Sequence, residues 1–114
     1  MIRLCAAGDL PSGQARRFDV EGLRVALVCI GEDFYAIGDR CSHADVSLSD
    51  GEVMVEDREI ECWKHGSTFS LLTGIPSCLP ANRPVPTYVV AVVEGDVFLD
   101  LQPAQPAQGQ EVRP

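Results

Sequence analysis

A chain of 114 residues, 46% hydrophobic and 23% charged, has the composition of one globular domain that is long enough to bury a core. Its formal net charge of −8 argues against binding to nucleic acid or to an anionic membrane surface, and it favours docking to a basic patch on a protein partner. No apolar run approaches the ~18 residues that span a bilayer or has the form of a secretory signal, so we expect a soluble cytoplasmic protein.

Short β-type runs separated by turn residues follow one another along the chain, as in β-sandwiches and small barrels. Turn signals occur at 21–22, 31–33, 50–51, 73–74 and 94–96. Helical periodicity is poor, and at most one helical turn is expected, around 44–49. The predicted strands are 2–7, 15–20, 23–30, 34–38, a hairpin over 52–62, 67–72, 87–93 and 97–101.

Two segments are not predicted to form strands. Residues 76–86 contain four of the eight prolines, which rules out a central strand there. Residues 102–114 are rich in Pro, Gln and Ala without an apolar face, and we expect a disordered tail. One domain over residues 1–101 is therefore predicted.

Both histidines of the chain lie close behind cysteines, in the order Cys41-x-His43 and Cys62-x-x-His65. Thiolate and imidazole are ligands for zinc or for iron in a sulfide cluster. Structural zinc sites usually pair Cys with Cys and His with His, whereas here each pair is mixed. Mixed pairs suit a [2Fe–2S] centre of the Rieske kind, in which two Cys bind one iron and two His the other. A zinc module and ordinary buried residues remain the alternatives.

The stretches CSHADVSLSDG (41–51) and ECWKHGSTFSLLTG (61–74) resemble the two cluster loops of Rieske-type ferredoxins. The likeness extends to FYAIGDRCSH (34–43) and LTGIPSCLPANRPVPTYVV (72–90), spans roughly residues 1–101, and is closest to the soluble bacterial ferredoxins of ring-hydroxylating oxygenases. It implies an all-β fold, an antiparallel sandwich or barrel with a small cluster-binding subdomain. The cluster loops would span about 39–50 and 61–69, and a proline-rich loop at about 79–86 would cover one side.

The resemblance also implies the roles of individual residues. Cys41 and Cys62 would bind the inner iron, and His43 and His65 the outer iron nearer solvent. Three neighbours would complete the site. Gly66 would let the backbone approach the cluster, and Ser67 would donate a hydrogen bond to sulfur. Trp63 would shield the cluster or form part of a docking surface, in preference to gating electron entry.

Three positions depart from the relatives that oxidise quinol. Val46 and Lys64 stand where those proteins have a disulfide, and Phe69 stands where they have a tyrosine hydroxyl. A missing hydroxyl donor removes stabilisation from the reduced, more negative cluster. We therefore expect a potential near the low end of the ~ −150 to +300 mV Rieske range.

The remaining cysteines have a simpler interpretation. Five cysteines cannot form a closed disulfide framework. Cys29 lies in an apolar run and is expected to be a small core residue, as is Cys5. Cys78 lies in the proline-rich segment, and packing is the preferred interpretation there too.

The function that the resemblance implies is one-electron transfer from a flavin-containing, NAD(P)H-dependent reductase to a terminal oxygenase, by a monomer. No histidine remains for a mononuclear iron site, so the chain is expected to be an electron-transfer component and not itself an enzyme. The alternatives are an accessory protein of iron–sulfur cluster assembly or sensing, and the small subunit of an assimilatory nitrite reductase.

Overall fold

The structure, a computed structural model, describes residues 1–42, 45–64, 66–77 and 83–105. Within these ranges, two short 3₁₀ helices accompany the strands, and neither is long and apolar enough to cross a membrane. The elements are β1 (Ile2–Ala6), η1 (Ala7–Asp9), β2 (Gln14–Val20), β3 (Leu23–Ile30), β4 (Asp33–Gly38), η2 (Leu48–Asp50), β5 (Val53–Met54), β6 (Glu59–Glu61), β7 (Thr68–Ser70), β8 (Thr87–Val93) and β9 (Asp96–Gln105).

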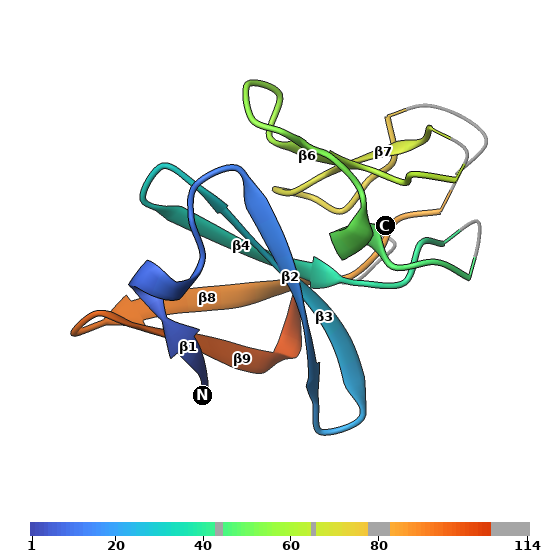
Figure 1. The fold of residues 1–114 in the computed structure, drawn as a ribbon. Helices are drawn as coiled ribbons and strands as arrows, with labels where there is room; N and C mark the ends of the chain where they lie inside the picture. The colour runs from blue at the N-terminus through green and yellow to red at the C-terminus, as the bar shows by residue number, and fades with distance from the viewer. Residues whose placement is uncertain (43–44, 65, 78–82, 106–114) are drawn as a thin grey trace.

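Six strands form one antiparallel sheet in the order β1-β9-β8-β4-β3-β2, which curls into a nearly closed barrel (Figure 1). Tight turns join its hairpins. In the β2–β3 turn, Glu21 and Gly22 both have positive φ, 53° and 82°, and Glu94 and Gly95 repeat this in the β8–β9 turn. Two successive residues with positive φ match the right-handed twist of the flanking strands. The predicted hairpins are confirmed.

β3 is buried on both faces, which explains why its sequence is one continuous apolar run. Val25, Leu27 and Cys29 point into the barrel, together with residues of β1, β4, β8 and β9. Ala26 and Val28 point the other way, into a second core. This strand therefore joins the barrel to the part of the molecule described next.

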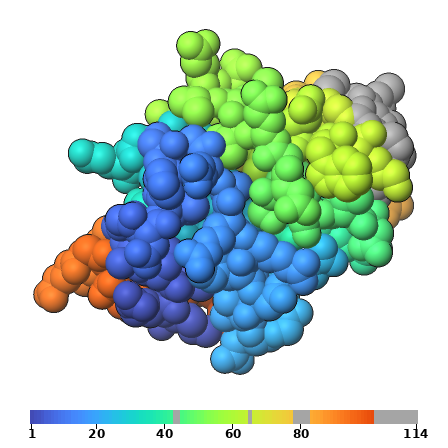
Figure 2. Space-filling view, viewed as in Figure 1, coloured from blue at the N-terminus to red at the C-terminus, as the bar shows by residue number. Residues whose placement is uncertain are grey.

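The chain between β4 and β8 forms a second, three-stranded sheet in the order β5-β6-β7, which lies against the barrel (Figure 1). The second core fills the space between them, with Ile60 and Phe69 from the small sheet and Leu48 from η2 all fully buried. Figure 2 shows the green segment around η2 packed directly on the blue strands of the barrel. The predicted all-β fold with an inserted subdomain is thus confirmed.

The end of the ordered domain differs from the prediction. β9 continues to Gln105, four residues past the predicted boundary at 101, because Thr87 pairs with Gln105 and Tyr88 with Pro103. The pairing of β1 with β9 reaches only Leu99, so the missing N–H of Pro103 falls where that neighbour has ended. The rest of the predicted tail, 106–114, lies outside the described residues.

Smaller differences concern the insert. The single helical turn expected at 44–49 is the 3₁₀ helix η2, at 48–50. The strand predicted over 67–72 is the shorter β7, because residues 71–73 already turn toward Gly74, whose φ is +78°. The proline-rich segment forms no strand among its described residues, 76–77 and 83–86, apart from one isolated bridge between Phe69 and Pro76.

Candidate metal centre

Cys41 lies just beyond the end of β4, where the chain leaves the barrel for the insert. Its backbone N–H donates to the carbonyl oxygen of Val46 at 3.0 Å, and Arg40 forms an isolated antiparallel bridge with Ser47. These contacts close the first predicted cluster loop at its base. The side chain of Cys41 is 3% exposed.

Cys62 follows β6 directly and begins a tight turn. Its N–H donates to the carbonyl of Ser67 at 2.7 Å, and the N–H of Gly66 donates back to the carbonyl of Cys62 at 2.9 Å. Gly66 has a φ of +80°, a conformation that residues with a Cβ rarely adopt. The two hydrogen bonds close the second predicted loop, and Cys62 is 0% exposed.

The two cysteines belong to one buried apolar cluster, together with Ile60, Phe69 and Val85. None of the four described cysteines forms a disulfide bond. His43 and His65 lie outside the described residues, and the remaining, described part of the chain brings together no group of three His, Cys, Asp or Glu side chains that could hold a metal. Half of the predicted ligand set is thus placed together, and the complete set stays a prediction.

The three predicted neighbours of the ligands lie in or beside the second loop. Ser67 is 1% exposed, so its hydroxyl is held inside the apolar core beside Cys62. Among the described residues, a Cβ on Gly66 would meet only the carboxylate of Glu61, at 3.9 Å, so it is the positive φ that favours glycine here. Trp63 is 56% exposed, which suits the predicted shield or docking surface.

The structure also describes the three positions at which this chain departs from the relatives that oxidise quinol. Phe69 is fully buried in the shared core, and Val46 packs against that core. Lys64 is exposed to solvent. No thiol stands at either loop position, and the ring of Phe69 brings no hydroxyl to the core around Cys41 and Cys62.

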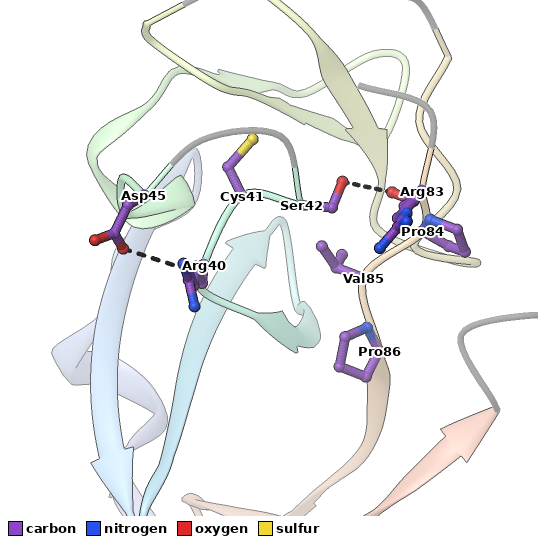
Figure 3. Close-up of a pocket in the computed structure, with 8 residues that line it drawn as sticks. All are labelled: Arg40, Cys41, Ser42, Asp45, Arg83, Pro84, Val85 and Pro86. Carbon is purple, nitrogen blue, oxygen red and sulfur yellow. Dashed lines mark hydrogen bonds and ion pairs between the residues drawn. The ribbon is translucent and has the colours of Figure 1, made fainter. Parts of the chain in front are cut away.

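A hollow of about 460 Å³ lies beside the first loop, between residues 40–42 and Asp45 on one side and the return segment 83–86 on the other (Figure 3). The hydroxyl of Ser42 donates to the carbonyl of Arg83 at 2.6 Å and ties the two sides together. Sequence reasoning missed Ser42, because a serine between two proposed ligands carries no signal of a contact 41 residues away. Cys78 and half of the predicted proline loop, residues 79–82, lie outside the described residues.

Cys5 and Cys29 have the structural role that was expected. Both are buried in the barrel core. Desolvation by burial raises the pKa of each thiol above its ordinary value, and nearby carboxylates act in the same direction, those of Asp9 and Asp96 on Cys5 and that of Asp33 on Cys29. These thiols stay protonated near neutral pH and are poor metal ligands.

The donor set fits an iron–sulfur cluster better than a hydrolytic metal site. Cys41 and Cys62 present two thiols inside an apolar, water-poor core, which suits soft thiolate coordination to iron. Each thiol lies next to a loop closed by backbone hydrogen bonds, and Ser67 adds a buried hydroxyl to the second loop.

Comparison with protein families matches residues 1–89 to the Rieske [2Fe–2S] domain. The ferredoxin subunit of 3-phenylpropionate/cinnamic acid dioxygenase from Escherichia coli K12 is 46% identical over 105 residues, which cover 92% of this chain and 97% of the relative.

Solved structures give the same picture. A chain from the complex of reduced oxygenase and oxidised ferredoxin in carbazole 1,9a-dioxygenase superposes with a TM-score of 0.83 at 36% identity, over 90% of this chain and 94% of that one. A putative small subunit of an NADPH nitrite reductase superposes with a TM-score of 0.76 at 26% identity, over 87% and 96%. The similarity to the dioxygenase ferredoxins is thus the stronger one in both sequence and shape.

Proposed function

This chain belongs to the Rieske [2Fe–2S] domain family, and we propose that it is the ferredoxin of a ring-hydroxylating dioxygenase system. It is an electron-transfer component and not a catalytic subunit. The observation that carries the proposal is the burial of Cys41 and Cys62 in one apolar core, in a chain that matches a dioxygenase ferredoxin subunit over almost its whole length. Its cofactor is a [2Fe–2S] cluster, which when bound takes up and releases one electron at a time.

We assign the four ligands as Cys41, His43, Cys62 and His65. The chain keeps water away from the thiols by packing them against Ile60 and Phe69. The polypeptide thereby supplies orientation and a low-dielectric environment, and the redox chemistry belongs to the cluster.

We further propose that a flavin-containing, NAD(P)H-dependent reductase supplies the electrons and that a terminal oxygenase receives them, in the cytoplasm and with this protein as a monomer. The exposed ring of Trp63, next to Cys62, provides apolar surface at the second loop for such partners. The overall charge of −8 favours partners with basic docking patches. An accessory role in cluster assembly, or in nitrite reduction, would use the same fold without an oxygenase.

Electron delivery can be measured directly. The reduced protein, mixed anaerobically with the oxygenase of the E. coli 3-phenylpropionate system, is expected to reduce that oxygenase's Rieske centre within seconds. The change in the visible absorbance of the oxygenase measures this reduction. The Cys62→Ala variant, which we expect to lack the cluster, is the matched control. A cluster-loaded protein that reduces neither this oxygenase nor those of related dioxygenase systems would contradict the proposed function.

The midpoint potential is the second test. We expect a value near the low end of the ~ −150 to +300 mV range, because no tyrosine hydroxyl reaches the cluster region from position 69. Phe69→Tyr restores that hydroxyl and is expected to raise the midpoint. A redox titration that places the unaltered protein well above +100 mV would overturn the assignment as a low-potential carrier.

A further inference from the structure

Asp39 is a fully buried acidic residue at the base of the first cluster loop. Its side chain is 0% exposed. Asp39 lies directly after β4 and two residues before Cys41, so their Cα atoms are at most about 7.6 Å apart. A charge placed there, away from water, acts on the metal centre with little screening.

Asp39 is held by contacts to β3 and to η2 at the far end of the first loop. Its N–H donates to the carbonyl of Arg24 on β3 at 3.0 Å, and its own carbonyl accepts from the N–H of Leu48 at 2.6 Å. One carboxylate oxygen, Oδ1, accepts from the N–H of Ser49 at 2.9 Å. The position of this charge relative to Cys41 is therefore set by the fold and not by a mobile side chain.

The other carboxylate oxygen, Oδ2, has no hydrogen-bond partner among the described residues. The positively charged groups nearest to Oδ2 lie at the long end of ion-pair distances. The Nη2 atom of Arg24 is 3.7 Å from Oδ2, and the Nε atom of Arg17 is 4.0 Å from it. Both arginines are shared. Arg17 pairs more closely with Asp19, at 2.8 Å, and Arg24 also lies 3.8 Å from Asp45.

We propose that the buried carboxylate of Asp39 is a fixed negative charge beside the metal centre. Because this charge is incompletely compensated, it lowers the reduction potential of the centre. Electron uptake makes the cluster more negative, so a fixed negative charge close by opposes it. The inference rests on the bound [2Fe–2S] cluster and does not depend on which oxygenase receives the electron.

A simple estimate gives the size of the effect. At an effective dielectric constant of about 20, a unit charge on the order of 10 Å from the point of electron uptake would change the equilibrium constant for that uptake by roughly tenfold. For one electron, a tenfold change corresponds to about 59 mV. Asp39→Asn removes the charge while keeping the side-chain shape and the oxygen that accepts from Ser49.

The experiment measures the midpoint potential of the cluster-loaded variants at one pH, with electron paramagnetic resonance of each reduced form to check that the cluster is unchanged. Asp39→Asn is expected to favour electron uptake by roughly tenfold. Arg24→Gln removes the counter-charge and is expected to shift the midpoint the opposite way. Asp45→Asn is the matched control, because Asp45 also lies near Arg24, at 3.8 Å, but is 75% exposed, so water screens its charge. Its closer partner is Arg40, at 3.3 Å (Figure 3).

The outcomes separate this inference from a merely structural role. A merely structural Asp39 would leave the midpoint of cluster-loaded Asp39→Asn unchanged, and that result overturns the inference. An equal shift in Asp45→Asn also overturns it, since burial would then be irrelevant. If Asp39→Asn does not hold the cluster, Arg24→Gln is compared with Arg40→Gln, which removes an arginine charge next to Cys41 that pairs with Asp45 and not with Asp39. A larger fall in the midpoint for Arg24→Gln supports the inference, and an equal or smaller fall overturns it. An oxygenase that accepts no electrons contradicts only the proposed function.

Discussion

Replacing Cys62 with alanine is expected to abolish iron binding. The residue begins the turn that closes the second loop, and its side chain is completely buried in the core that also contains Cys41. A cluster that loses one of its two thiolates has no other described thiol in that core to take its place. Iron and sulfide content, with the visible spectrum of the purified protein, measure the effect.

Cys29→Ala is the matched control for this experiment. Cys29 is buried to a similar degree, 3% exposed, but it lies in the barrel core, where burial raises the pKa of its thiol. This variant is expected to keep full iron content and to lose about 1 kcal/mol of stability, as is typical of a small core truncation. Stoichiometric iron in Cys62→Ala, or loss of iron in Cys29→Ala alone, would show that the ligand assignment is wrong.

A second variant tests the assignment even if Cys62→Ala folds poorly. His65→Cys keeps a metal-binding side chain but exchanges imidazole for thiolate, and it is expected to raise the average g value of the reduced cluster toward that of an all-cysteine [2Fe–2S] centre. An unchanged electron paramagnetic resonance spectrum in a variant that still holds iron would remove His65 from the ligand set.

Gly51→Ala is expected to cause a large loss of stability. Gly51 follows η2, and a Cβ there would lie 1.6 Å from the carbonyl oxygen of Glu61 and 2.9 Å from its carbonyl carbon. Both are backbone atoms of the residue just before Cys62, so no side chain can move aside. The backbones of the two cluster loops must separate, which costs about 3 kcal/mol or more.

The measurement is thermal unfolding together with iron content. For a domain of this size, such a loss lowers the Tm by more than about 10 °C. Gly8→Ala is the control, because a Cβ on Gly8 meets no atom of the described residues within 4 Å and its φ is not in the left-handed region. It is expected to change stability by no more than about 0.5 kcal/mol. A Gly51→Ala protein with the Tm and iron content of the unaltered chain would refute the close approach of the two loops.

At Gly51 the local pattern predicts the turn but not the reason for the glycine. Asp50–Gly51 predicted a turn, and the chain does turn there through η2. However, the φ of Gly51 is −88°, which any residue can adopt, so turn geometry is not why glycine is needed. The reason is the crossing carbonyl of Glu61, a contact between residues ten positions apart that no local pattern records.

Asp39 and Phe69 are similar cases. A single acidic residue at the end of an apolar strand predicts a surface position, yet the return of Leu48 and Ser49 across it buries its carboxylate. Phe69 was noticed for the hydroxyl it lacks. The structure adds that its ring fills the core shared by the two cysteines. In both cases burial depends on which distant segment folds over the residue.

The sequence by itself determined the strands, the hairpin turns and the types of metal-binding side chain. Alternating or continuous apolar runs specify strands over a few residues, glycine and its neighbours specify the turns, and thiol and imidazole chemistry belongs to the residues themselves. Only the tertiary structure decided the order of the strands, the extension of β9 to Gln105, and the meeting of Cys41 and Cys62 in one core. These features arise from contacts between segments far apart in the chain, whose energies depend on the packing of the whole domain and not on any local pattern.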